Sequence, residues 1–220
     1  MALKRDNIQS NDSIKIRGLK EPFELRDLNI EIKPNEHGKA ILSIRVKEEG
    51  KPSNIIKNIN KKMVSIHSSE KGNSGLLFKG YITECKINSR ESSGIVYVEL
   101  TSTSMELDKK YENESYQKKG ESYKKIIETV ASKSKGINSY CSGDLKKEKL
   151  EKPIIQYKET NWEFIKRIAS RFRLPVIADV TTDKPTFTIG YNQQSSAEEK
   201  DFIKARTTEF IRMGEYCIRR

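Results

Sequence analysis

The chain has 220 residues, of which 35% are hydrophobic and 33% are charged, and its formal net charge is +11. This length can bury the core of one large domain or of two small ones. No apolar run approaches the roughly 18–20 residues that cross a bilayer, and the first residues lack the apolar stretch of a secretory signal. We therefore expect a protein that is made in the cytoplasm and has no membrane-spanning segment.

The positive charge raises the possibility of a nucleic-acid partner. The basic residues are dispersed, however, and the densest groups, Lys57–Lys62 and Lys146–Lys149, are short. Arginines and aromatic residues are not interleaved as they are on surfaces that stack nucleic-acid bases. A lysine-rich solvated surface is the favoured interpretation, and a basic nucleic-acid-binding module is the alternative.

Alternating apolar residues predict several antiparallel strands in the first half of the chain. Residues 1–20 form an arm or an edge strand, with Ile14 and Ile16 as the apolar pair. From residue 21 to 104, about five strands separated by turns indicate a small antiparallel β-barrel. Gly80 interrupts the longest of them, Leu76–Ile87, and indicates a bulge or a tight bend. Asn54–Lys62 is ambiguous between a short helix and a loop.

The pattern changes after residue 104, so residues 105–175 are predicted to form a helical insert and connector. Met105–Gly120 is charged and irregular, Ser122–Lys135 has helical apolar spacing that Gly136 ends, and Ile137–Leu150 is expected to be a loop. Residues 176–220 are predicted to start a second β-barrel that is incomplete, with a strand at Thr186–Gly190 and further strands in the last twenty residues. The fold class is thus β-rich α+β, and the chain resembles a fragment.

Lys152–Val180 carries the sharpest local signal. Thr160 and Glu163 have the spacing of a capping box, which satisfies backbone N–H groups at a helix start. One helical face then carries Trp162, Ile165, Ile168, Ala169 and Phe172, and Pro175 ends the helix. Trp162, the only tryptophan, is either a binding anchor or a core residue, and the core interpretation is favoured.

No catalytic, cofactor-binding or metal-binding residues are expected. His37 and His67 have no carboxylate or cysteine at ligand spacing, so both are predicted to be surface histidines. Cys85, Cys141 and Cys217 form no Cys-x-x-Cys pair and are predicted to be reduced. No nucleophile or metalloprotease motif is present, and we expect neither an enzyme nor a small-molecule substrate.

The segment Gln156–Ala169, Gln-Tyr-Lys-Glu-Thr-Asn-Trp-Glu-Phe-Ile-Lys-Arg-Ile-Ala, resembles the Gln-Tyr-x-Glu-Ser/Thr-Asp-x-x-Phe-hydrophobic-x-Arg-Leu signature of the VgrG and phage late-control-D family. Phe78–Ile82, Val96–Thr101 and Tyr123–Ala131 resemble further parts of that family in the same order. The likeness spans roughly residues 20–190. After the helix the chain departs from the pattern of the long secretion spikes, with Phe172–Asp179 in place of their Glu-Gly-hydrophobic-Tyr-Tyr.

This resemblance implies a structural role. Family members are central baseplate hubs of contractile phage tails, tailocins and type VI secretion spikes. They form trimers in which two barrels per subunit make a pseudo-sixfold ring, and the ring adapts a hexameric tail tube to a threefold spike. The partners implied are two further copies of the chain, the tube protein and spike or baseplate proteins, assembled into a particle after synthesis in the bacterial cytoplasm. No cofactor is implied.

Overall fold

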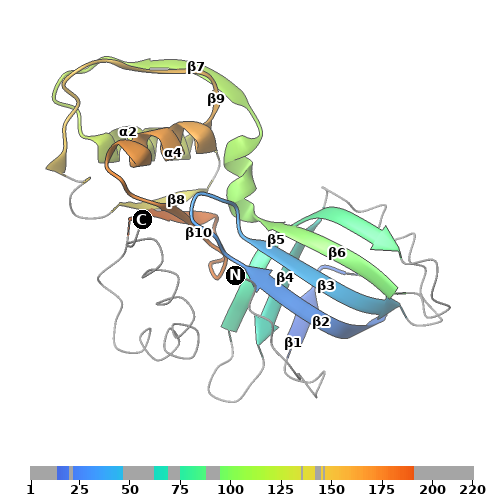
Figure 1. Cartoon of the computed structure of the whole chain (residues 1–220). Coiled ribbons are helices and arrows are strands. Elements are labelled where there is room, and N and C mark those ends of the chain that lie inside the picture. Colours follow the sequence, from blue (N-terminus) through green and yellow to red (C-terminus); the bar gives the residue numbers. More distant parts are fainter. Residues whose placement is uncertain are drawn as a thin grey trace. The chain divides into compact units, whose positions relative to one another are not determined.

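A six-stranded antiparallel sheet forms the N-terminal part of the protein (Figure 1). The computed structural model describes residues 14–19, 22–46, 62–68, 75–87, 95–134, 136–141, 145 and 147–190. The strands of this sheet are β1 (Ile14–Arg17), β2 (Phe23–Glu31), β3 (Lys39–Val46), β4 (Met63–Ser68), β5 (Gly75–Ile87) and β6 (Ile95–Ser102). Their spatial order is β1-β4-β5-β6-β3-β2, which puts β1 and β2 at the two edges.

Period-two alternation explains which face of the sheet is buried. In β3, Ala40, Leu42, Ile44 and Val46 are buried, while the residues between them lie at or near the surface. Register shifts beside Arg26, His67 and Thr83 interrupt the pairing, and such bulges increase the twist of a sheet. The result is a curled, half-barrel sheet over one apolar core, as predicted for a β-rich fold.

Gly80 has a different role from the one predicted. The bulges in β5 lie at Leu77, where the pairing with β4 shifts, and at Thr83, where the pairing with β6 shifts. Gly80 itself stays in register with Val64 of β4 and Ser102 of β6. A Cβ atom at position 80 would overlap the backbone of Thr101. Glycine is needed here because two backbones approach closely, which is another established reason for glycine inside a strand.

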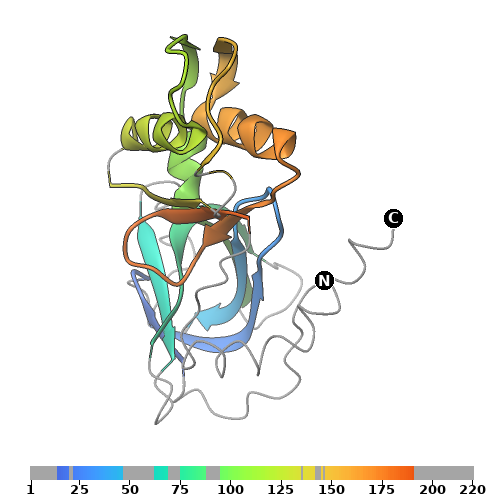
Figure 2. The ribbon, with the colours of Figure 1, turned by 90° about the vertical axis from the view of Figure 1, so that its left-hand side faces the viewer.

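The rest of the described chain forms three layers beyond this sheet. The 3-10 helix η1 (Thr103–Asp108) leads to β7 (Tyr111–Tyr116), α2 (Tyr123–Ser132), β8 (Asn138–Cys141), β9 (Ile154–Thr160), α4 (Asn161–Arg171), β10 (Val176–Asp179) and β11 (Thr186–Ile189). Helices α2 and α4 lie side by side between a three-stranded sheet, β10-β11-β8, and a two-stranded ribbon, β7-β9 (Figure 2).

Two predictions for this region were wrong in detail. Met105–Gly120 is not irregular but contains η1 and β7, and Ile137–Leu150 is not all loop because it contains β8. Strand β7, Tyr-Glu-Asn-Glu-Ser-Tyr, has no apolar alternation and depends on antiparallel pairing with β9, about forty residues later. Strand β8 pairs in parallel with β11, so its partner is also distant in sequence.

Helix α2 matches its predicted apolar face, and α4 also buries Phe164, which its predicted face does not include. Ile126, Ile127, Val130 and Ala131 of α2 are buried, and α2 begins at Ser122, whose side chain accepts a hydrogen bond from the Lys125 N–H. The helix ends at Ser132, before Gly136. Of the helices in the described residues, none is long and apolar enough to cross a membrane.

The domain boundaries drawn at residues 20, 104 and 175 remain predictions. Residues 176–190 provide β10 and β11, which pair with β8 from the preceding segment. The strands expected after residue 190, and nearly all of the ambiguous segment Asn54–Lys62, lie outside the described residues.

Candidate functional site at the junction of sheet and helices

The start of α4 carries the predicted capping box. The Thr160 hydroxyl accepts a hydrogen bond from the Glu163 N–H at 3.1 Å, and the Glu163 carboxylate accepts one from the Thr160 N–H at 2.8 Å. The two contacts satisfy backbone donors that a helix start otherwise leaves unpaired. They fix the direction in which α4 leaves β9.

Asp108 links this capping box to the first sheet. Its carboxylate accepts a hydrogen bond from the Thr160 hydroxyl on one oxygen and lies 2.8 Å from His37 Nε2 on the other. Asp108 ends η1, which follows β6 directly, and His37 lies in the β2–β3 connection. One carboxylate therefore joins three segments that are far apart in the sequence.

A chain of hydroxyl groups continues from His37 into the protein. His37 Nδ1 lies 2.8 Å from the Ser104 hydroxyl, which lies 2.8 Å from the Ser102 hydroxyl. Because the Asp108 carboxylate only accepts, Nε2 of His37 carries a hydrogen. In the neutral ring Nδ1 then accepts from Ser104, and Ser104 can in turn accept from Ser102. Every polar group in this chain thus has a partner, as buried polar groups require.

The environment of Asp108 favours its charged form. Partial burial acts to raise the pKa of Asp108, but the hydrogen bonds from His37 and Thr160 act in the opposite direction. The charges of His37 and Lys166 add to these hydrogen bonds, and the net effect is a pKa below the usual value of an aspartate. Asp108 is therefore a carboxylate at neutral pH, as its role as acceptor requires.

Ser104, His37 and Asp108 have the residue types of a hydrolase triad, so a nucleophile role needs a physical test. The Ser104 residue is only 1% exposed, which leaves a substrate no route to its hydroxyl. The His37 ring is packed against the Trp162 indole, with the ring centroids 4.5 Å apart. A nucleophile must reach the bond that it attacks, so the geometry supports a structural link and not acyl transfer.

Trp162 fills the space beneath this network. Its side chain is buried, stacks on His37, and meets Phe187 of β11 edge to face with centroids 6.1 Å apart. The core interpretation of Trp162 is confirmed. The indole connects the capped helix, the β2–β3 connection and the three-stranded sheet in one contact.

Strand β10 provides a second connection to the six-stranded sheet. At its start, the Asn35 N–H donates to the Val176 carbonyl at 2.7 Å, and the Val176 N–H donates to Asn35 Oδ1 at 3.0 Å. Just past its end, the Val180 carbonyl accepts from the Lys79 N–H at 3.0 Å. Val180 packs in the core of the six-stranded sheet, although it follows β10. Hydrogen bonds at both ends of β10 thus attach this strand to the six-stranded sheet and its β2–β3 connection.

Asn35 is well suited to its position. Its φ of 65° is in the left-handed region, which asparagine tolerates better than most residues because its short side chain can bond locally. The backbone and the side-chain amide of Asn35 both face Val176, and together they imitate one step of strand pairing. The turn at Pro34 and Asn35 therefore also attaches β10 to the six-stranded sheet.

The prediction that His37 is a surface histidine was wrong. Its side chain is only 15% exposed and contacts a carboxylate that lies 71 residues later. His67 lies half-buried in β4, with Nε2 3.1 Å from the Ser65 hydroxyl. Within the described residues, no group of three or more His, Cys, Asp or Glu side chains is placed to hold a metal ion.

Comparison with known proteins gives a consistent result at the level of structure. No family model and no curated protein sequence matches the chain. Among solved structures, the E. coli c3393 protein matches with a TM-score of 0.59 at 16% identity, over 82% of this chain and 49% of that chain. It is described as a component of the type VI secretion system with structural similarity to the T4 bacteriophage tail proteins gp27 and gp5.

Two tail proteins match with similar scores. The 43 kDa tail protein of prophage MuSo2 from Shewanella oneidensis gives a TM-score of 0.60 at 14% identity, over 84% of this chain and 55% of that chain. A tail protein from Neisseria meningitidis MC58 gives 0.57 at 14% identity, over 84% and 52%. The fold of this chain is therefore similar to part of the fold of these three proteins. This chain spans about half the length of each of these neighbours, and at such identities the likeness concerns the fold alone.

Proposed function

We propose that the chain is a structural hub protein, or a fragment of one, in a contractile phage tail, a tailocin or a type VI-like injection machine. The observation that carries the proposal is the shared fold, which covers 82–84% of the chain in three tail or secretion-system proteins. The Gln156–Ala169 motif, with its capping box in place at Thr160, supports the narrower assignment to the VgrG and late-control-D family.

The construction of the junction agrees with a mechanical role. Its polar groups contact one another and its aromatic ring is covered, so it presents no reactive group to a substrate. A hub transmits load between a tube and a spike, and such a part benefits from elements fixed at several points. The double attachment of β10 and the capped start of α4 would give it that rigidity.

In the proposed assembly the chain is a homotrimer. Each subunit would contribute two barrels, the first of them the curled sheet β1–β6, to a pseudo-sixfold ring between a hexameric tail tube and a trimeric spike. The direct partners would be the tube protein and spike or baseplate proteins. No small-molecule substrate or cofactor enters this model.

Light scattering on the purified chain tests the proposal, with negative-stain imaging in the presence of tube protein. We expect either the mass of three 25.3 kDa chains in solution or ring-shaped particles with tube protein. A chain that stays monomeric and associates with neither tube protein nor a full-length hub contradicts the proposal. Muramidase or peptidase activity in the purified chain would contradict the structural role.

A further inference from the structure

The two-stranded ribbon β7-β9 has one face toward the helices and one face away from them (Figure 1). In β9, Ile154 and Gln156 are buried, whereas Ile155 and Tyr157, which alternate with them, are exposed. The register pairs Asn113 with Tyr157 and Ser115 with Ile155. By alternation, Tyr111, Asn113 and Ser115 of β7 share the exposed face with Ile155 and Tyr157 of β9. We call this set of five residues the outer ribbon face.

The outer ribbon face is unusually apolar for a solvated surface. Tyr111, Ile155 and Tyr157 are 59–69% exposed, and in the described part of the chain no other large hydrophobic side chain exceeds the 55% of Tyr140. Three large side chains this exposed, gathered on one narrow ribbon, are typical of an interaction surface, whereas single exposed residues are not. Tyrosine is also enriched where proteins bind one another.

The ribbon's acidic groups are engaged elsewhere. Glu114 contacts Lys133, the residue after α2, at 2.9 Å, and Glu159 makes a two-point contact with Arg167 of α4, at 2.7 and 2.8 Å. Glu112 is 3.6 Å from Lys110. These carboxylates neutralise cations beside the ribbon. The outer ribbon face itself contains no carboxylate.

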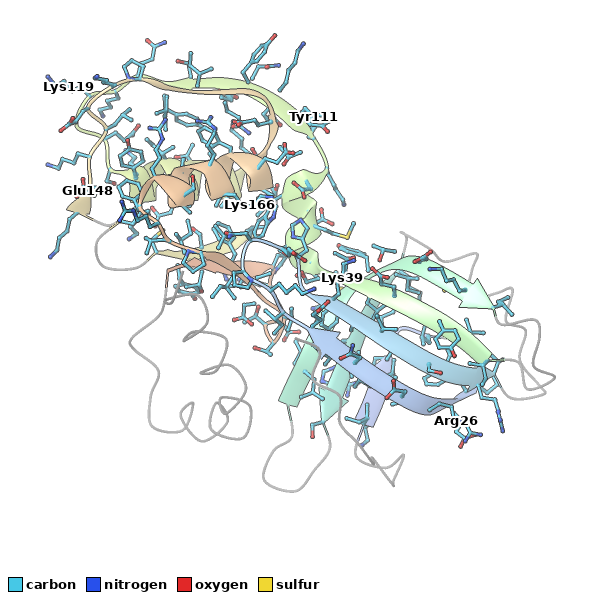
Figure 3. The ribbon with its side chains drawn as sticks, in the orientation of Figure 1. Arg26, Lys39, Tyr111, Lys119, Glu148 and Lys166 are labelled. Atoms are coloured by element: carbon cyan, nitrogen blue, oxygen red, sulfur yellow. The ribbon has the colours of Figure 1, made fainter. Side chains whose placement is uncertain are left out.

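Lysines lie beside the outer ribbon face and at the end of the ribbon where its strands join the neighbouring segments. Six exposed lysines there have no ion-pair partner among the described residues: Lys118, Lys119, Lys147, Lys149, Lys152 and Lys158. The backbone bonds Gly120–Leu150 and Tyr123–Glu148 hold the two lysine-bearing segments together. Glu148 and Glu151 are the exposed acidic residues nearby. Figure 3 shows Tyr111 and Lys119 at opposite ends of the ribbon.

We propose that the outer ribbon face is a docking surface for an acidic protein partner that presents an apolar stripe between its carboxylates. The apolar side chains would supply the buried centre of the contact, and the surrounding lysines would supply charge complementarity and faster association. The Lys158 ammonium lies over the Tyr157 ring, 5.3 Å from its centroid, so a basic group adjoins the apolar side chains of this face.

The charge of the chain argues against other occupants. A second copy docked through the same face would bring the same lysines to the contact, since a twofold interface places the same surface on both sides. A second copy docked through another face would bring a chain whose net charge is +11. Nucleic acid would pair with the lysines, but it would leave the isoleucine at the centre of the face without an apolar partner. The outer ribbon face also contains no arginine that could stack on a base. An acidic protein with an apolar stripe would complement both the exposed apolar side chains of the outer ribbon face and the lysines beside them.

This inference rests on the ribbon and is independent of the proposed hub role. A peripheral protein could dock on the ribbon in a particle of any kind. The oligomeric state measured by light scattering tests the hub proposal, whereas the experiment below measures binding to one face. Either one can fail while the other holds.

The probe is a fluorescein-labelled peptide of alternating Glu and Phe, measured by fluorescence anisotropy with the full chain. We expect saturable binding that weakens at least about tenfold between low salt and 0.5 M salt, because surface charge contacts are screened. A Tyr111→Ser, Ile155→Ser, Tyr157→Ser variant should bind about tenfold more weakly. Tyr140→Ser, which removes an exposed tyrosine from β8, is the matched control and should bind within about twofold of the unchanged chain.

Two further peptides separate the contributions of charge and apolar area. A Glu and Ser peptide should bind at least about tenfold more weakly than the Glu and Phe peptide, and a Lys and Phe peptide should not bind. The triple variant should keep the far-ultraviolet circular dichroism and melting temperature of the unchanged chain, since it alters exposed side chains only.

Three results would overturn the inference. The first is no binding of the Glu and Phe peptide, and the second is equal binding by the triple variant. The third is tighter binding of a single-stranded oligonucleotide that the triple variant retains, which would assign the lysines to nucleic acid.

Discussion

Val180 occupies the space that a side chain at Gly38 would need. A Cβ atom built on Gly38 would overlap the Val180 side chain, and both residues are buried beside the core of the six-stranded sheet. Gly38 precedes β3 and Val180 follows β10, so 142 positions separate two residues that share one space. The segment before β3 and the segment after β10 can therefore pack together only because Gly38 has no side chain.

Gly38→Ala should destabilise the protein. The added methyl group must displace Val180 or the backbone, and overpacking of this kind costs about 1–3 kcal/mol. Urea unfolding followed by circular dichroism measures the free energy of unfolding. In a Val180→Ala background the same change should cost much less, because the smaller side chain leaves room for the methyl group.

Gly75→Ala is the control for this cycle. Gly75 also belongs to the six-stranded sheet, but nothing lies within 4 Å of its would-be Cβ atom. The substitution should change the free energy of unfolding by less than about 0.5 kcal/mol. Equal effects of Gly38→Ala with and without Val180→Ala would show that the two positions are not coupled.

The strands of the first sheet were predictable because their partners lie nearby and one face is buried throughout. The alternation in β3 determines both its strand conformation and the face that it buries, since a one-residue slip would expose Ala40, Leu42, Ile44 and Val46. The start of α4 was predictable for a similar reason. Thr160 and Glu163 are three residues apart, so the whole capping device is visible in one short stretch.

The junction could not be predicted because its contacts join residues distant in sequence. Nothing local distinguishes His37 from a surface histidine, and the contact with Asp108 exists only after both segments have folded. The same holds for β7 and β8, which are too short or too polar to form strands without the edges of β9 and β11. Local patterns identify elements, while the tertiary contacts decide which polar residues become buried links.

Thr160→Ala should destabilise the protein more than Ser122→Ala. Both residues cap a helix, and loss of a cap costs about 0.5–2 kcal/mol. Thr160 also donates to Asp108, so its removal leaves that carboxylate short of a partner as well. Thr160→Ser keeps the hydroxyl and should retain most of the stability. Thermal melts of the three variants at one pH provide the comparison, and equal losses for both alanine variants would contradict the link to Asp108.

Asp108→Asn should lower stability in a way that depends on pH. Because the pKa of Asp108 in the folded protein lies below its usual value, its carboxylate stabilises the fold above the usual aspartate pKa of about 3.9. That contribution is lost as the pH falls through the lower, folded-state pKa. The difference in melting temperature between the unchanged chain and Asp108→Asn should thus be largest near neutral pH and shrink below about pH 4.

Asp183→Asn is the control for this pH series. The Asp183 carboxylate contacts Lys79 at 3.2 Å but is exposed to solvent, and an exposed pair contributes little to stability. Its substitution should change the melting temperature only slightly at any pH. If the effect of Asp108→Asn were the same at pH 7 and pH 3, the carboxylate charge would have no part in the junction.

Trp162→Ala tests whether the junction stabilises the whole fold. Removing a buried tryptophan leaves a large cavity and costs about 3–5 kcal/mol, and here it also uncovers the His37 ring and the edge of Phe187. Tyr157→Ala, five residues earlier on the exposed face of β9, should cost less than about 0.5 kcal/mol. Unfolding must be followed by circular dichroism, since the substitution removes the only tryptophan and with it the tryptophan fluorescence. If Trp162→Ala does not fold, Trp162→Phe keeps part of the contact and should show an intermediate loss. The indole would not be central to the stability of the junction if Trp162→Phe were as stable as the unchanged chain. The same would follow if Trp162→Ala lost no more free energy of unfolding than Tyr157→Ala.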